Sequence, residues 1–359
     1  MASPNEPRLP RRTPTGKTAG PVHVWVHGKT DLGRTRDHNE DTFLVADLSS
    51  GAEQSATPDE HHVVGPRGSL FMVADGMGGA AAGELASAMA AETIYQHLAT
   101  AWVADPNPSP ERFATHIRAA VELANERIHH YAVDHPDVRG MGTTVTAAGV
   151  YGADLYLAQI GDSRGYLVRR GHAIQLTKDQ SLMQRLVDAG ELTEEEAEQS
   201  EHRNIILQAL GPDSRIQVEL TWQPIRRGDI LVLCSDGLTS QVRKSEIAAL
   251  ASEEPDLPRL CSRLIDLANG RGGPDNITVV VAKFDGEGLP EPEVDDAPSY
   301  QAIEPSDLAL DTSQAPGSAF APAPGDASHF PAVRFTLSSL AYIGVAALLG
   351  LLGWWLLTR

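Results

Sequence analysis

Short apolar runs separated by turn-forming residues fill most of this chain. Runs rich in Val, Ile, Leu and Ala that end at Gly, Pro, Asp or Ser are typical of buried β-strands. The pattern predicts strands over 22–26, 42–46, 70–74, 141–150, 155–160, 164–168, 230–234 and 277–284. Longer segments with a helical period of apolar positions predict helices over 80–98, 111–130, 244–251 and 257–267.

The connections between the middle strands are short. Gly152-Ala153-Asp154 and Gly161-Asp162-Ser163 leave no room for a parallel crossover, so we expect 141–150, 155–160 and 164–168 to form an antiparallel meander. Strand-rich halves with helices grouped in pairs favour a layered α+β sandwich over a parallel Rossmann sheet. A polar insertion between 179 and 210, with a short helix around 182–186 and capping-box spacing over Thr193–Glu196, is expected to be a lid.

The two ends of the chain differ from the body over 22–285. Residues 1–21 carry Arg and Lys without an apolar core, which predicts a disordered basic arm. Residues 286–334 are rich in Pro, Ala and acidic residues, which predicts a flexible linker.

The segment 335–357 is uncharged, apolar and long enough to cross about 30 Å of hydrocarbon, so it is expected to be a transmembrane helix. Only two residues follow it. A single-pass C-terminal anchor therefore leaves the body in the cytoplasm.

The formal net charge is −19, yet ten acidic residues and no Lys or Arg lie between 285 and 333. About half of the excess thus belongs to the linker, and the body has no basic stripe, so no nucleic-acid partner is expected. Cys234 and Cys261 are the only cysteines, which excludes a disulfide framework and a CxxC zinc site.

Aspartates recur where the predicted strands end. Rigid strands would bring these carboxylates together, and their mutual repulsion would require cations. Ligand sets made only of oxygen favour Mg²⁺ or Mn²⁺. The four blocks are Asp75-Gly76-Met77-Gly78-Gly79, Gly161-Asp162-Ser163-Arg164, Ser235-Asp236-Gly237 and Gly273-Pro274-Asp275-Asn276.

One further block, over 28–41, contains Arg36, Glu40 and Asp41. With the aspartate blocks, Gly142-Thr143-Thr144 and Asp179-Gln180-Ser181, its order and spacing resemble the bacterial form of the metal-dependent (PPM-type) protein phosphatase 2C family over about residues 22–284. The resemblance implies a four-layer αββα sandwich, with two antiparallel sheets flanked by helices and a two-metal site at one edge between the sheets.

The resemblance also implies roles for individual residues. Asp75 would bridge both metals, with the carbonyl of Gly76 as a further ligand, and Asp236 and Asp275 would complete one metal site. Glu40 would hold the other metal through water, and Asp41 would orient these ligands.

Other residues of the motifs carry alternatives. Arg36 matches the family's phosphate-binding arginine, or it forms a surface ion pair with Asp37 or Glu40. Asp162 matches the ligand of a third, weaker metal, or it caps a turn. Ser163 and Asp179 are expected to contact the metal ligands without binding a metal themselves, or to shape turns.

Met77 stands where eukaryotic members carry a histidine proposed to protonate the leaving alkoxide. Bacterial members often have Met there, so this departure does not imply inactivity. The general acid is then unassigned: a metal-bound water could serve, and His38 is either a second candidate or a surface residue.

The implied activity is hydrolysis of phosphoserine and phosphothreonine on proteins, with two Mn²⁺ or Mg²⁺ ions and a bridging hydroxide that attacks phosphorus in line. The enzyme would work at the membrane and oppose a Ser/Thr protein kinase. The alternatives are a membrane-tethered pseudophosphatase that binds phosphorylated partners and a small-molecule phosphohydrolase. The presence of Asp75, Asp236 and Asp275 favours an enzyme.

Overall fold

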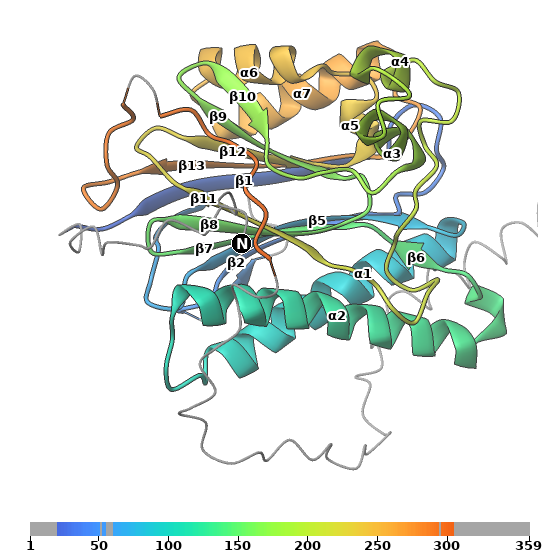
Figure 1. Ribbon diagram of the computed structural model, residues 1–359, viewed down its shortest axis with the longest axis horizontal. Helices are drawn as coiled ribbons and strands as arrows, with labels where there is room; N and C mark the ends of the chain where they lie inside the picture. The colour runs from blue at the N-terminus through green and yellow to red at the C-terminus, as the bar shows by residue number, and fades with distance from the viewer. Residues whose placement is uncertain (1–19, 51, 55–59, 294–295, 305–359) are drawn as a thin grey trace, which may run out of the picture. The chain divides into compact units, whose positions relative to one another are not determined.

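The computed structural model describes residues 20–50, 52–54, 60–293 and 296–304. In this part of the chain, two antiparallel sheets stack face to face and helices cover both outer faces (Figure 1). This is the α+β sandwich expected from the sequence. The predicted basic arm over 1–21 and the predicted transmembrane segment lie outside the described residues, except for residues 20 and 21. Among the described helices, none combines the length and apolar character that crossing a bilayer requires.

One sheet has six strands in the order β10-β9-β12-β13-β1-β4. Its strands are β1 (His23–Asp31), β4 (Glu60–Val63), β9 (Arg164–Arg169), β10 (His172–Gln175), β12 (Ile230–Cys234) and β13 (Ile277–Asp285). The other sheet follows the order β11-β8-β7-β5-β2-β3, with β6 paired to β5. Its strands are β2 (Asp41–Asp47), β3 (Ala52–Gln54), β5 (Ser69–Met77), β6 (Gly142–Thr143), β7 (Val145–Tyr151), β8 (Asp154–Ile160) and β11 (Glu219–Pro224).

Two long helices cover the second sheet, and two others cover the first (Figure 1). They are α1 (Ala80–His97) and α2 (Pro110–Asp134), and α6 (Lys244–Glu253) and α7 (Leu257–Gly270). The remaining helices are α3 (Leu182–Asp188), α4 (Glu194–Glu198) and α5 (Asp236–Thr239), with a π-helical turn at Leu98–Trp102 and a 3-10 turn at Pro136–Val138. Apolar side chains fill the space between the sheets, including Val24, Phe71, Leu157, Leu233 and Phe284.

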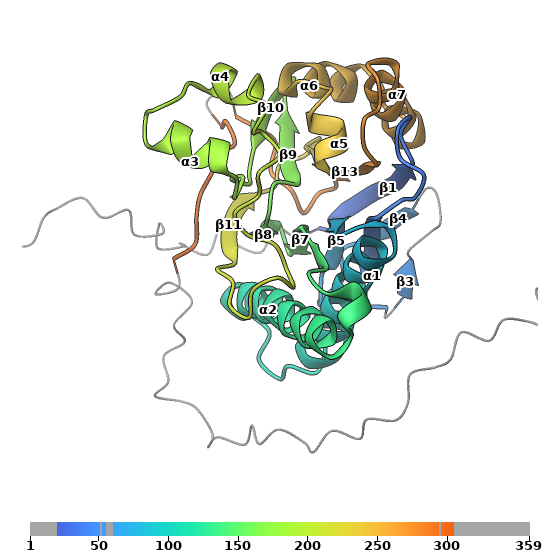
Figure 2. The same ribbon diagram turned by 90° about the vertical axis from the view of Figure 1, so that its right-hand side faces the viewer.

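The polar insertion forms α3 and α4, which lie outside the four layers (Figure 2). The predicted capping box is present, because Thr193 and Glu196 each accept a hydrogen bond from the other's backbone N–H. These helices are held mainly at their ends. Leu207 N–H donates to the carbonyl of Gln180 at 2.8 Å, which closes the base of the insertion.

The predicted meander is wrong at its last strand. β7 and β8 pair as expected, but β9 pairs with β10 and β12 in the other sheet. Gly161, with φ of 96°, turns the chain from one sheet to the other. Stacked sheets lie about 10 Å apart, a gap that a three-residue link can span. A short link therefore does not require that the two strands pair.

The predicted linker over 286–334 also differs at its start, because residues 286–293 and 296–304 pack on the body. Leu289 and Ile303 are buried. Trp222 N–H donates to Gln301 O at 3.0 Å, and Ile303 N–H donates to Leu220 O at 2.8 Å, so the segment extends the sheet beyond the edge strand β11. The part of the linker beyond residue 304 is outside the described residues.

Candidate functional site

Strand register brings the predicted site residues to one end of the two sheets. Asp41 lies directly opposite Asp75 across the β2–β5 pair. In the other sheet, Asp31 lies opposite Ile277 across the β1–β13 pair. The loop that follows β1 and contains Arg36 therefore lies beside the turn that contains Asp275.

The remaining two aspartates come from turns at the same end. Asp236 begins α5 directly after β12, and Asp162 lies in the turn by which the chain leaves β8 for β9. The side chains of Asp236 and Asp75 share a hydrogen bond, and the charges of Asp162 and Asp275 act on Asp75. The fold thus assembles four carboxyl groups that are far apart in the sequence.

The surroundings of these clustered aspartates disfavour their ionised carboxylates. Burial, followed by the charge of neighbouring aspartates, raises the pKa of Asp41 to about 7 and that of Asp162 to about 8. The same causes raise the pKa of Asp236 to about 6 and hold the pKa of Asp75 well above its usual range. Without a cation, burial and mutual repulsion favour the protonated form of these carboxyl groups.

The donor atoms fit divalent cations with a preference for oxygen. One carboxylate oxygen of Asp41 and one of Asp162, both Oδ1, are buried and have no hydrogen-bond partner among the described residues. In the same part of the chain, no three His, Cys, Asp or Glu side chains form a group that could hold a metal ion by themselves. Backbone carbonyls and water would complete the ligand set, as they commonly do for Mg²⁺.

Arg36 contacts a candidate ligand. Its Nη2 donates to Asp275 Oδ2 at 2.8 Å, whereas the sequence allowed a surface pairing with Asp37 or Glu40. This hydrogen bond is the main cause of the raised pKa of Arg36. The Arg36 side chain is 48% exposed, so its other N–H groups are accessible from solvent.

Glu40 lies beside tightly packed glycines. Its backbone carbonyl accepts the N–H of Gly76 at 3.1 Å. A Cβ at Gly83 would come within 2.1 Å of Glu40 Oε2, and a Cβ at Gly76 would come within 2.2 Å of Gly83 O. Burial raises the pKa of Glu40. Glycine at position 83 thus leaves space for this carboxylate, and glycine at position 76 lets β5 approach the backbone of Glu40 and Gly83.

Asp41 and Asp75 are held by hydroxyl groups. Ser235 Oγ donates to Asp41 Oδ2 at 2.8 Å. The N–H of Asp75 donates to Thr144 Oγ1 at 3.1 Å, and the hydroxyls of Thr144 and Ser163 are 2.7 Å apart. Ser163 is fully buried, so it reaches Asp75 only through Thr144.

Asp179 forms an ion pair with Arg164. It accepts two hydrogen bonds from the guanidinium of Arg164, at 2.9 Å from Nε and 2.6 Å from Nη2. Because Arg164 directly follows Ser163, this pair fixes the turn that carries Asp162 to the start of the insertion.

Asn276 was not among the predicted site residues, although it lies in the last aspartate block. Its Nδ2 donates to the carbonyls of Leu32 at 3.0 Å and His38 at 2.9 Å, and its Oδ1 accepts the N–H of Glu40 at 2.8 Å. This buried amide ties the loop of Arg36 and Glu40 to the turn of Asp275. The signal that could have identified Asn276 from the sequence is its position next to Asp275.

Met77 is half-buried at the end of β5. A thioether has no proton to donate. Met77 therefore cannot protonate a leaving alkoxide, as the sequence indicated.

Comparisons with known proteins agree with this geometry. A family model described as protein phosphatase 2C matches residues 50–272. The serine/threonine phosphatase stp of Listeria monocytogenes is 36% identical over 258 residues, covering 72% of this chain and 94% of that protein. The serine/threonine protein phosphatase PstP of Mycobacterium tuberculosis is 43% identical over 254 residues, covering 71% of this chain and 44% of that protein.

Solved structures show the same fold. The crystal structure of the M. tuberculosis phosphatase PstP/Ppp matches with a TM-score of 0.62 at 36% identity, covering 73% of this chain and 99% of that chain. The PstP catalytic domain in complex with two manganese ions matches with a TM-score of 0.60 at 36% identity, covering 74% of this chain and 99% of that chain. The chain therefore belongs to the protein phosphatase 2C family.

Proposed function

We propose that this chain hydrolyses phosphoserine and phosphothreonine on proteins at a site that binds two Mn²⁺ or Mg²⁺ ions. The observation that carries the proposal is the convergence of Asp75, Asp162, Asp236 and Asp275, with one buried Asp162 oxygen unpartnered among the described residues. Buried carboxyl groups whose charges act on one another in this way require bound cations or protons. Family membership makes cations the better explanation.

The proposed ligands are Asp75, the carbonyl of Gly76, Asp236 and Asp275, with Glu40 acting through water and Asp162 available to a third ion. Divalent ions bound there would activate water and neutralise charge on the phosphoryl oxygens. The protein's own contribution is to hold the carboxylates in place. Asp41 and Thr144 fix one end of β5, and Asn276 fixes the loop that carries Glu40.

Arg36 is the proposed phosphate-binding residue. A guanidinium has five N–H donors, so Arg36 can keep its contact with Asp275 and still offer a pair of donors to phosphoryl oxygens. Its exposure makes it accessible to a phosphorylated side chain. This contact would orient the phosphoryl group for attack by water.

The decisive experiment is hydrolysis of a phosphothreonine peptide with added Mn²⁺ or Mg²⁺, with and without a chelator. We expect metal-dependent release of phosphate that the chelator abolishes. Binding of the peptide without turnover would instead identify a pseudophosphatase. Hydrolysis of small phosphate esters alone, with no turnover of any phosphopeptide, would identify a small-molecule phosphohydrolase.

We infer from the apolar segment over 335–357 that the enzyme is tethered to the membrane with its catalytic domain in the cytoplasm, where it opposes a Ser/Thr protein kinase. Truncation after Pro331 tests the tether. The truncated protein should stay active and leave the membrane fraction. Sedimentation of the truncated protein with membranes would contradict the anchor.

A further inference from the structure

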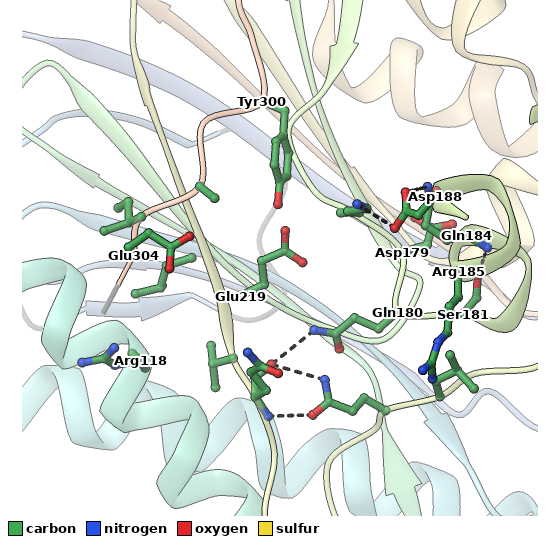
Figure 3. A pocket seen from close by; sticks show the side chains of 18 residues that line it. Arg118, Asp179, Gln180, Ser181, Gln184, Arg185, Asp188, Glu219, Tyr300 and Glu304 are labelled. Atoms are coloured by element: carbon green, nitrogen blue, oxygen red, sulfur yellow. Dashed lines mark hydrogen bonds and ion pairs between the residues drawn. The ribbon is translucent and has the colours of Figure 1, made fainter. Parts of the chain in front are cut away.

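A cavity of about 550 Å³ lies between α3, β11 and residues 300–304 (Figure 3). Its volume is in the range of ordinary ligand sites, which is roughly 300–1,000 Å³. None of the described residues that line it is a candidate metal ligand. The packed start of the predicted linker forms one wall, with Tyr300, Ala302 and Ile303. This cavity has no part in the function proposed above.

Glu219 is the distinctive group in the cavity. Its carboxylate is half-buried and has no hydrogen bond or ion pair with any described residue, and burial raises its pKa to about 7. Figure 3 shows the hydroxyl end of Tyr300 pointing toward this carboxylate from the opposite wall. A carboxylate that faces a hydroxyl oxygen offers two acceptors to one cationic hydrogen-bond donor.

Other charged groups also line the cavity, including the exposed acid Glu304 on the wall formed by residues 300–304. Lys178 is already paired with Asp188 at 2.7 Å, and Asp179 is paired with Arg164. Figure 3 places Arg118 and Arg185 on opposite sides of Glu219. These arginines would repel further cations at the ends of the cavity. They would tolerate neutral or acidic groups on either side of a central basic one.

The cavity borders the candidate active site through one side chain. Gln180 lines the cavity, and its Oε1 accepts the N–H of Gly161 at 2.9 Å, next to Asp162. Its backbone N–H donates to Gly161 O at 2.8 Å. Gln180 therefore joins the wall of the cavity to the turn that carries Asp162.

Resting on the proposed phosphatase function, we propose that the cavity is a docking subsite for one arginine or lysine side chain of the phosphorylated protein. The cationic group donates hydrogen bonds to the carboxylate of Glu219 and to the hydroxyl oxygen of Tyr300. In the phosphorylated protein, the residues on either side of this arginine or lysine are neutral or acidic. The subsite thus selects substrates by a residue outside the phosphorylated position.

The test uses phosphothreonine peptides in which one arginine is moved along the sequence and replaced at each position by citrulline, its uncharged analogue. At one position, kcat/KM of the native enzyme should fall about fivefold or more on replacement, mainly through KM. Glu219→Gln should remove this difference and leave hydrolysis of the citrulline peptide unchanged. Tyr300→Phe should weaken the preference, because it removes the second acceptor and keeps the ring.

Glu122→Gln is the matched control, because Glu122 is an exposed acid on α2 outside the cavity. It should keep the native preference. Equal kcat/KM for arginine and citrulline peptides at every position in the native enzyme would overturn the proposal. A preference that persists in Glu219→Gln would overturn it as well.

Binding of the unphosphorylated peptides, followed by fluorescence anisotropy, separates this proposal from the phosphatase function. The arginine peptide should bind the native protein about fivefold more tightly than the citrulline peptide, and Glu219→Gln should bind both equally. Such binding without any turnover would retain the subsite and refute the phosphatase. Turnover without an arginine preference in either assay would support the phosphatase function and refute the docking subsite.

Discussion

The side-chain oxygen of Asn276 accepts a hydrogen bond from the backbone N–H of Glu40 at 2.8 Å. The two residues are 236 positions apart, and the bond joins the turn of Asp275 to the loop of Arg36. Since the same amide also donates to Leu32 and His38, one side chain positions residues on both sides of the candidate site.

Asn276→Ala should weaken Mn²⁺ activation, because Glu40 and Asp275 lose their common support. Partners that orient metal ligands typically affect metal affinity or activity about 10- to 100-fold when removed. We expect a loss of that size in a manganese titration of phosphopeptide hydrolysis. Asn204→Ala, an exposed asparagine in the insertion, should behave like the native protein. An unchanged titration in Asn276→Ala would contradict the positioning role.

Asp75→Asn and Asp236→Asn should each abolish manganese-dependent hydrolysis of a phosphothreonine peptide. Each removes a charged oxygen from the proposed ligand set, so the loss should exceed the roughly 100-fold limit typical of supporting residues. Circular dichroism should show that both variants remain folded, since each removes one negative charge from a crowded cluster. Undiminished turnover in either variant would refute the metal assignment.

Arg36→Lys tests the proposed phosphate contact. An ammonium cannot offer the paired donors of a guanidinium, so kcat/KM should fall about tenfold or more while Mn²⁺ binding is retained. Arg34→Lys on the same loop is the control. Arg34 is exposed and has no side-chain ion pair among the described residues. Equal losses in the two variants would argue against a specific role for Arg36.

The metal-free protein should become less stable as the pH rises from about 4 to about 8. The pKa of Asp41, Asp162 and Asp236 is raised in the folded state, so folding binds protons there that the unfolded chain releases near pH 4. The stabilisation is complete below that pH and is lost as the pH passes the folded pKa of each group, at about 6, 7 and 8.

Urea unfolding of the chelator-treated protein across this range measures the effect. Saturating Mn²⁺ should reduce the dependence, because a cation stabilises the charged carboxylates. A metal-free protein whose unfolding free energy increased with pH over the same range would contradict the electrostatic description of the cluster.

Asp296→Ala should destabilise the fold by about 1–3 kcal/mol, because it removes a carboxylate shared by two arginines and leaves the buried Arg169 with Asp229 as its remaining ion-pair partner. Asp296 pairs with Arg226 and with Arg169, whose side chain is only 2% exposed. Glu291→Ala is the control on the same segment, since its pair with Arg227 is exposed and should contribute at most about 1 kcal/mol. Equal unfolding free energies in the two variants would show that the segment over 286–304 is not anchored by Asp296.

The sequence by itself determined the local elements and the positions of the acidic residues. Apolar runs identified β5 and β12 and placed Asp75 and Asp236 at their ends, because burial imposes a recognisable pattern on each strand. The short strands β3, β4, β10 and β11 were missed, since each mixes polar with apolar residues and has no continuous apolar run like that of β12. The aspartate blocks and the block over 28–41 also identified the protein phosphatase 2C family.

Only the tertiary structure decided which elements meet. Tertiary contacts decide which sheet contains β9, and they pair Arg36 with Asp275. They also place the bridging amide of Asn276 and pack residues 286–293 and 296–304 on the body. Local patterns report whether a residue is buried but not which distant residue lies beside it. Those contacts are set by the joint packing of segments more than two hundred residues apart, such as β1 and β13.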